Sequence, residues 1–435
     1  MEANKNKLFH KFLLLWTGEF ISAIGSGLTS FGLGIYVFQV TGKASATALV
    51  TLLAFLPSLL LSTVAGVLAD RYDRRLLMIL GDSLSITGLA FILICIMQGG
   101  AEVWHICIGV TISSVFSSLI EPAYKATVTD LLSEEQYTKA SGLVQITGSA
   151  KYLISPVAAG FLLTMSDIRL LLIIDICTVF VTIASTFAVR SGIQAKSYER
   201  KKSFLGEFKD GWNAISRKRG VLVLTVVGTL ITFSLGFIQT LILPMLLTIT
   251  DSSTVGYCET IVATGMLLSS LLIGILSIKK NYVKTLSLSL ALGGVFMALV
   301  GVSENLVFIC IAGFLFFAML PFSNASLDYL IRTNIDNSVQ GRAWSLIGLI
   351  SQMGYIGAYA IAGVLADYVF TPLLLEGGAL AGSVGKVIGT GAGRGMGLLI
   401  IVSGLLLPVI SIALYHMKSI RSLEKVTTKM MEIGI

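Results

Sequence analysis

The chain has 435 residues, of which 55% are hydrophobic and only 13% are charged, and its formal net charge is +7. So few charges cannot cover the surface of a soluble fold of this length, and so many apolar residues exclude intrinsic disorder. Because a membrane-spanning helix needs about 20 apolar residues, the composition predicts an all-α polytopic membrane protein with almost no room for an aqueous enzyme domain.

Apolar segments between charged or Gly/Pro breaks predict twelve transmembrane helices. Each must be helical, because lipid offers no partner to an open backbone group. The first apolar segment is too long for a signal peptide and is expected to be retained. The predicted spans are 12–38, 46–69, 76–98, 103–126, 140–164, 169–189, 220–247, 255–278, 285–302, 306–331, 343–370 and 396–416.

The basic residues predict the orientation. Loops on the side of the N-terminus carry 26 of the 31 Lys and Arg residues, the opposite loops carry four, and Lys151 lies inside a span. The positive-inside rule then places both termini in the cytoplasm. The positive charge is therefore a topology signal with some attraction to anionic lipid, and no nucleic-acid partner is expected.

The longest predicted cytoplasmic loop divides the spans into two sets of six. Apolar residues recur in it at helical spacing among Lys and Arg, which predicts an interfacial amphipathic helix; a merely solvated basic linker is the alternative. These residues are Phe204, Leu205, Phe208, Trp212 and Ile215. The predicted divisions are an N-terminal half (1–190), a linker (191–219), a C-terminal half (220–418) and a cytoplasmic tail (419–435).

Weak internal similarity relates the two halves. The segment 140–164 aligns with 343–367 after a shift of 203 residues, with six identical residues. Glu121 and Lys125 fall on Asp328 and Arg332 after a shift of 207. The order and direction of these matches predict a parallel 6+6 repeat, whose substrate site lies near the midplane where the halves meet.

A charged turn between spans two and three is the strongest short motif. Gly66 allows close helix approach, Asp70 can cap the N-terminus of a neighbouring helix, and the arginines can anchor the turn to headgroups. A purely topological role is the alternative. The residues expected to form this conformational switch are Gly66, Asp70, Arg71, Asp73, Arg74 and Arg75. The letters GVLAD recur at 363–367 on the outer side without arginines, which we interpret as a coincidence within the repeat.

The turn resembles the signature of the major facilitator superfamily (MFS), G-x-L-[AV]-D-R-x-[GD]-R-[KR]. Asp73 stands where most of the superfamily has Gly and is similar to the macrolide-efflux branch, as are 131–140 and 341–348. The resemblance implies the MFS fold, alternating access, and a cavity lined by spans one, four, seven and ten. It also implies that Asp70 steadies the outward-open state against the start of span eleven, near Arg342.

Span five is similar to the Gly/Pro signature of drug antiporters. Its small residues and proline allow close packing and bending, as an interdomain contact would need; ordinary small-residue packing is the alternative. The matching residues are Gly142, Ser155, Pro156 and Gly160, and Lys151 replaces a glycine of the signature.

Ionisable residues inside spans are costly and are functional candidates by default. Glu19 lies about ten residues into span one, where the family often has Gln. Lys151 is a candidate substitute for the Arg that the efflux branch carries in span four. The predicted substrate and proton-coupling residues are Glu19, Ser26, Ser30, Ser114, Ser118, Glu121 and Lys151. The pairs Glu121–Lys125 and Asp328–Arg332 are expected to form i,i+4 ion pairs, and Asp175 and Glu259 are expected to be interfacial.

The sequence carries no nucleotide-binding, metalloprotease or nucleophile-elbow motif, and the Gly-rich outer loop 376–397 lacks the spacing of a dinucleotide fingerprint. That loop is predicted to be flexible or lipid-skimming. We expect no cofactor, no metal and no enzymatic activity. The sequence favours a monomeric, proton-gradient-driven exporter of small lipophilic drugs such as macrolides in the cell membrane; the alternative is a facilitator or symporter of a metabolite on the same fold. A membrane enzyme or a non-transporting receptor is disfavoured by the repeat and the charged turn.

Overall fold

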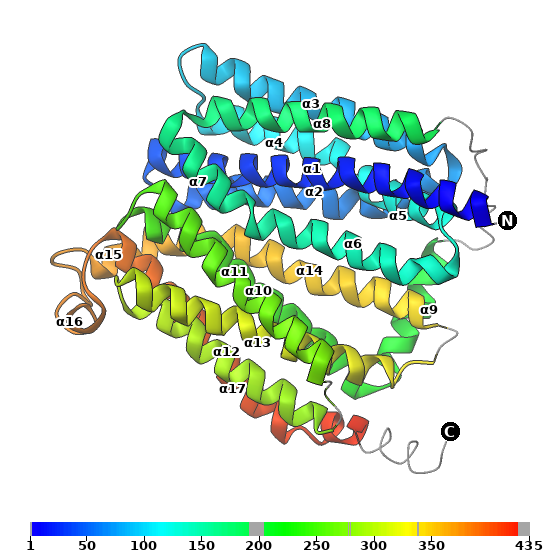
Figure 1. The fold of residues 1–435 in the computed structure, drawn as a ribbon. Helices are drawn as coiled ribbons and strands as arrows, with labels where there is room; N and C mark the ends of the chain where they lie inside the picture. Colours follow the sequence, from blue (N-terminus) through cyan, green and yellow to red (C-terminus); the bar gives the residue numbers. More distant parts are fainter. Residues whose placement is uncertain (1, 191–203, 277, 279, 337–338, 425–435) are drawn as a thin grey trace. The chain divides into compact units, whose positions relative to one another are not determined.

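The computed structural model describes residues 2–190, 204–276, 278, 280–336 and 339–424. This part of the chain is helical and contains no strand (Figure 1). The helices are α1 (Glu2–Thr41), α2 (Ala44–Arg71), α3 (Arg74–Met97), α4 (Val103–Ser117), α5 (Ile120–Leu131), α6 (Glu134–Leu153), α7 (Ser155–Met165), α8 (Ile168–Arg190), α9 (Phe204–Ser216), α10 (Arg219–Leu247), α11 (Ser252–Leu276), α12 (Tyr282–Val302), α13 (Leu306–Arg332), α14 (Gln340–Leu365), the π-helix η1 (Ala366–Phe370), α15 (Thr371–Leu374), α16 (Gly385–Ile388) and α17 (Ala392–His416).

Twelve of these helical stretches are long and apolar enough to span a membrane, which confirms the predicted span number. We call "inner" the side on which the sequence places the termini. Two spans predicted as continuous are each divided: span four into α4 and α5, span five into α6 and α7. Pro122 and Pro156 explain the breaks, because a proline has no N–H and its ring clashes with the carbonyl four residues earlier.

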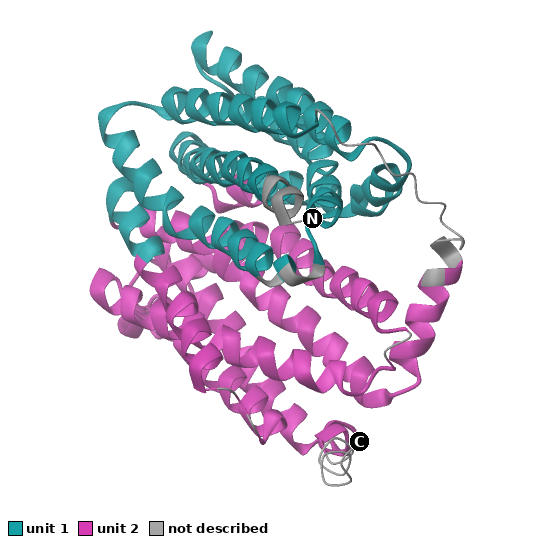
Figure 2. Ribbon diagram, turned by 45° about the vertical axis from the view of Figure 1, so that its right-hand side comes forward, with its two compact units in different colours: residues 1–42, 49–200, 250–260 teal, residues 43–48, 201–249, 261–435 magenta. Residues whose placement is uncertain are grey.

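The described chain forms two compact units (Figure 2). Unit 1 comprises residues 1–42, 49–200 and 250–260, and unit 2 comprises 43–48, 201–249 and 261–435. Two helices change unit along their length: α2 begins in unit 2, and α11 begins in unit 1. In both helices the first turns belong to a different unit from the remainder.

Close backbone approach organises unit 1. In α1, a Cβ at Gly18 would lie 2.2 Å from the Ser185 hydroxyl of α8, and the Thr182 hydroxyl donates to the Gly18 carbonyl at 3.1 Å. Between α3 and α4, a Cβ at Gly88 would lie 2.2 Å from the carbonyl oxygen of Gly109. At these crossings small residues let the helix backbones approach closely, as is common between membrane helices.

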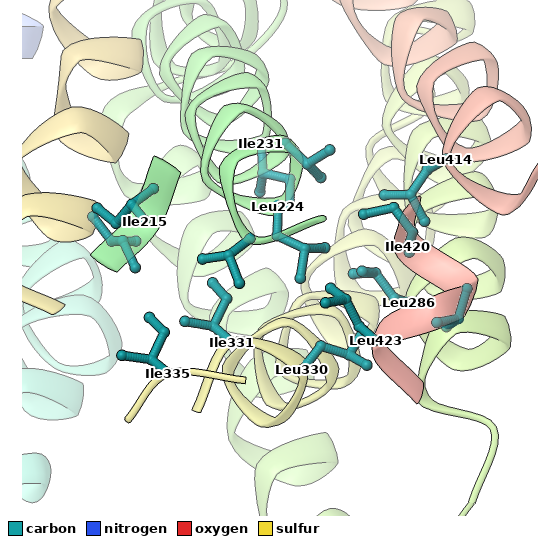
Figure 3. Close-up of a cluster of buried hydrophobic side chains, with 14 of the residues drawn as sticks. Ile215, Leu224, Ile231, Leu286, Leu330, Ile331, Ile335, Leu414, Ile420 and Leu423 are labelled. Carbon is teal, nitrogen blue, oxygen red and sulfur yellow. The ribbon is translucent and has the colours of Figure 1, made fainter. Parts of the chain in front are cut away.

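A cluster of buried aliphatic side chains forms the core of unit 2 (Figure 3). Ile215 of α9 is fully buried in it, together with Leu224 and Ile347. The helix expected in the linker is thus present, but one side of it packs inside unit 2, and only its other side, with Trp212 at 45% exposure, fits an interfacial position.

Arg394 anchors the Gly-rich outer loop. Its side chain is 2% exposed although it opens α17. The guanidinium donates to the carbonyls of Gly301 (2.5 Å) and Ser303 (3.3 Å), where α12 ends. The last carbonyls of a helix have no intrahelical donor, so Arg394 satisfies them and ties α17 to α12. The prediction of a flexible or lipid-skimming loop missed this anchor.

Candidate functional site

Glu19 lies on α1 among small residues that pack against α8. On neighbouring turns a Cβ at Gly18 or at Gly25 would overlap hydroxyl groups of α8. This close contact fixes the rotation of α1 and leaves Glu19 half-buried beside other helices of unit 1. Small residues on α1 therefore pack against α8, and this contact determines where the Glu19 side chain points.

Two further helices bring ionisable groups toward Glu19. Its carboxylate is close enough to those of Glu121 on α5 and Asp82 on α3 for their charges to interact. The phenol of Tyr124, also on α5, lies within the same range. Three helices thus surround one small group of titratable side chains.

Asp82 is a residue that the sequence analysis missed. It is 3% exposed, and its Oδ2 has no hydrogen-bond partner among the described residues. The Tyr124 hydroxyl, in a side chain that is 6% exposed, is likewise buried without a partner there. An acid within an apolar span was a visible signal, since intramembrane ionisable residues are functional candidates by default.

The hydroxyl groups of the four serines predicted as site residues all donate to backbone carbonyls. Ser26 and Ser30 donate within α1, to Ala23 (3.2 Å) and to Ser26 (2.8 Å). Ser118 donates to Val115, whereas Ser114 bridges to the Ala54 carbonyl of α2 at 2.6 Å. Ser114 therefore acts as a helix-to-helix contact. A substrate role for these serines stays a prediction.

The predicted ion pair between Glu121 and Lys125 is present, with Nζ and Oε1 2.6 Å apart and both side chains largely exposed. Exposed pairs of this kind contribute little stability. Lys151 lies elsewhere: its charge acts on Asp175 of α8.

The expectation that Asp175 is interfacial was wrong. The side chain is 2% exposed, because α8 packs tightly on α1 at Gly25, where a Cβ would lie 3.1 Å from the Asp175 carboxylate. The buried Asp175 and the half-buried Lys151 are therefore a second set of charged residues in unit 1 whose charges interact. Glu259, which was also expected at the interface, is half-buried on α11.

The charged turn between α2 and α3 forms an ion network at the inner end of unit 1. Asp73 is the N-cap of α3, accepts the N–H of Arg75 at 3.1 Å, and pairs with Arg190 at the end of α8 at 2.9 Å. Arg74 pairs with Asp130 of α5 at 2.7 Å. Asp130 and Arg190 were not foreseen, because only the tertiary fold brings them to the turn.

The first residues of the same turn are not engaged. A Cβ at Gly66 would meet nothing within 4 Å. The side chain of Asp70 has no hydrogen bond or ion pair with any described residue, and Arg71 is exposed. Arg342, near which the resemblance places Asp70, pairs with Asp210 of α9 at 2.8 Å. The switch role of Asp70 stays a prediction.

The span-five motif lies where α7 meets α1 and the first turns of α11. Ser155 donates to the Ile24 carbonyl at 3.0 Å. A Cβ at Gly160 would lie 2.8 Å from the Ser252 carbonyl oxygen, and one at Gly256 would lie 2.3 Å from that of Pro156. Gly142, by contrast, has no heavy atom within 4 Å of its Cβ position.

The predicted ion pair in span ten does not form. No contact within 4 Å joins Asp328 to Arg332, although the two charges influence each other. The guanidinium instead lies over the Trp344 ring of α14, 5.6 Å from its centroid. A cation over an aromatic face gains a comparable attraction, and a local i,i+4 rule cannot foresee it.

The twelve long apolar helices among the described residues define a multi-pass membrane protein. The profile of the Major Facilitator Superfamily matches residues 15–249, and the chain belongs to this superfamily.

Two named relatives share about a quarter of their residues with the chain. Macrolide efflux protein A of Streptococcus pyogenes is 26% identical over 373 residues, covering 82% of this chain and 90% of the relative. The uncharacterized MFS-type transporter YfiS of Bacillus subtilis (strain 168) is 25% identical over 371 residues, covering 82% and 87%.

Solved structures share the fold at low identity. The nucleoside transporter NupG is 12% identical with a TM-score of 0.74, covering 94% of this chain and 100% of that one. A bacterial homologue of the iron transporter ferroportin, in an inward-facing state, is 14% identical with a TM-score of 0.69, covering 94% and 99%. The MFS fold expected from the sequence is therefore confirmed.

Proposed function

We propose that this transporter exports small lipophilic molecules in exchange for protons, with Glu19 as the residue that takes up and releases the proton. It would act in the cell membrane as a monomer with both termini in the cytoplasm. The observation that carries the proposal is the set of titratable groups that α3 and α5 place around Glu19 inside unit 1.

Two carboxylic acids in one poorly solvated site cannot both be charged without a large electrostatic cost. We infer that one of the two acids, Glu19 or the buried Asp82, carries a proton while the other is ionised. The Tyr124 hydroxyl, which has no partner among the described residues, is the available neutral donor. Such a pair can exchange a proton as the site changes its access to water.

The substrate class is proposed from the relatives. Macrolide efflux protein A resembles this chain along most of both sequences, and macrolides are lipophilic amines. A cationic amine near the pair would favour its ionised form, so that proton and substrate compete by linkage. The chemistry of the site fits this exchange without any cofactor.

The experiment uses the full chain reconstituted into liposomes with erythromycin as the probe. In the wild type, an imposed proton gradient should drive accumulation, and substrate binding should release protons. Glu19→Gln should keep exchange between equal substrate pools but lose accumulation, and its substrate affinity should no longer depend on pH.

Glu376→Gln is the matched control, because this exposed carboxylate lies in the Gly-rich outer loop of unit 2, whereas Glu19 belongs to unit 1. It should accumulate substrate like the wild type. Uphill accumulation by Glu19→Gln with a normal pH profile would contradict the proposed role of Glu19. Substrate movement by the wild type without proton release would favour the facilitator of a metabolite instead.

A further inference from the structure

The second copy of the letters GVLAD, residues 363–367, makes a contact that its sequence did not lead us to expect. It spans the end of α14 and the start of η1, on the outer side. Its aspartate reaches the beginning of α2, more than 300 residues earlier in the chain. The first copy, at 66–70, lies at the opposite end of the same helix α2.

Asp367 caps the N-terminus of α2. Its two carboxylate oxygens accept the backbone N–H groups of Ala44 at 3.1 Å and Ser45 at 2.8 Å. The first N–H groups of a helix have no intrahelical acceptor, and a carboxylate also interacts favourably with the positive end of the helix dipole. The residue before α2 is Lys43, whose ammonium is a donor only, so the side-chain acceptor comes from η1.

Gly363 makes this cap possible by letting the two backbones approach. A Cβ at Gly363 would lie 2.5 Å from the Cα of Ser45 and 2.8 Å from the Cβ of Ala48. The facing groups also include the Ala44 carbonyl oxygen, and Ala44 and Ala48 are buried, at 0% and 2% exposure. Any larger residue at 363 would push the carboxylate away from the N–H groups.

Two observations motivate the idea that this contact changes between states of the transport cycle. The first turn of α2 groups with unit 2, whereas α2 from Leu49 onward groups with unit 1. Asp70, in the inner copy of the motif, has no partner among the described residues while Asp367 is engaged. The π-helical turn η1 sits at Asp367, and such turns are frequent at functional sites.

We propose that Gly363 and Asp367 form an outer latch, which holds the first turn of α2 against α14 in one state of the transport cycle and releases it in the other. Asp70 would serve the opposite state at the inner end of α2. The outer latch involves neither the substrate nor Glu19, so its test does not depend on whether the proposed drug efflux is correct.

The first test measures the two states directly. Spin labels are attached at Leu49→Cys and Tyr368→Cys, both exposed positions beside the latch, in a full-length protein whose five native cysteines are replaced. Pulsed electron resonance in nanodiscs should give a short and a long distance population. Asp367→Asn should raise the ratio of long to short on the order of tenfold, which corresponds to about 1.4 kcal/mol.

Gly363→Ala should act in the same direction, and Asp367→Glu should restore part of the short population. Glu376→Gln, another outer carboxylate, is the matched control and should leave the ratio unchanged. A single distance in the wild type would show a static cap and overturn the latch. An unchanged ratio in Asp367→Asn would overturn it as well.

Hydrogen exchange provides a second measurement that needs no labels. The amides of Ala44 and Ser45 should exchange about tenfold faster in Asp367→Asn, because exchange reports the opening of the bonded state. Amides in the middle of α14 should keep their wild-type rates. Faster exchange along the whole of α14 would mean general loosening of the fold and would refute a local latch.

Discussion

Replacing Asp73 by Ala should lower the stability of unit 1 by about 2 kcal/mol, because this side chain makes two separate contacts. As the N-cap of α3 it accepts the Arg75 N–H, with the extended backbone that a cap requires (φ −60°, ψ 111°). Loss of a cap costs about 1 kcal/mol. The ion pair with Arg190, whose side chain is 39% exposed, adds at most about 1 kcal/mol.

The assay is thermal unfolding of the purified protein in detergent. For a unit of this size, about 2 kcal/mol corresponds to a fall in the melting temperature of about 4–8 °C. Asp73→Asn keeps a cap acceptor and loses only the charge, so it should melt about 1–4 °C below the wild type. The exposed pair Glu121–Lys125 gives the control: Glu121→Gln should shift melting by less than about 2 °C.

A double-mutant cycle with Arg190→Met separates the two contributions. The coupling between residues 73 and 190 should be no more than about 1 kcal/mol, and the remaining loss in Asp73→Ala belongs to the cap. The reasoning would be refuted if Asp73→Ala and Asp73→Asn melted at the same temperature, since the cap would then contribute nothing.

Three further outcomes are expected in the same unfolding assay. Arg394→Met should destabilise by about 3 kcal/mol, because it leaves the buried Gly301 carbonyl and the part-buried Ser303 carbonyl, where α12 ends, without their donor; Arg394→Lys should lose less. Gly88→Ala should lower the melting temperature by spreading α3 from α4, whereas Gly66→Ala, with open space around it, should not. Asp251 accepts N–H groups at the start of α11, which lowers the pKa of its carboxyl. The deficit of Asp251→Ala should therefore be complete above about pH 4 and shrink as pH falls below it.

The number and type of the spans could be predicted because lipid leaves the backbone no alternative to the helix. The sequence was less informative about where a span is divided into two helices, because the lipid environment does not determine that. The breaks at Pro122 and Pro156 follow from proline chemistry, but prolines at 57, 244, 321 and 408 lie inside unbroken helices. Whether a proline divides a helix depends on neighbouring helices, which one sequence does not display.

The candidate site was predictable only where a contact is local. The ion pair Glu121–Lys125 follows from helix periodicity and is present. Arg332 has the same i,i+4 spacing from Asp328, but its guanidinium lies over the Trp344 ring of another helix instead. Asp82 was detectable as a charge inside a span, yet its nearness to Glu19 depends on how α1 and α3 pack. Asp130 and Arg190 became visible as partners of the charged turn only once the helices were assembled.

The ion network at the inner end of unit 1 gives its arginines two uses that are separated in time. On the orientation predicted from the basic residues, Arg74 and Arg75 would act as topogenic charges during insertion, before Asp130 has been synthesised, and acidic residues weigh little in that decision. After folding, the same guanidiniums are held by carboxylates and act as joints between helices. Biogenesis and stability are therefore genetically separable here: changing the acids should spare the orientation of the chain and weaken only the finished protein.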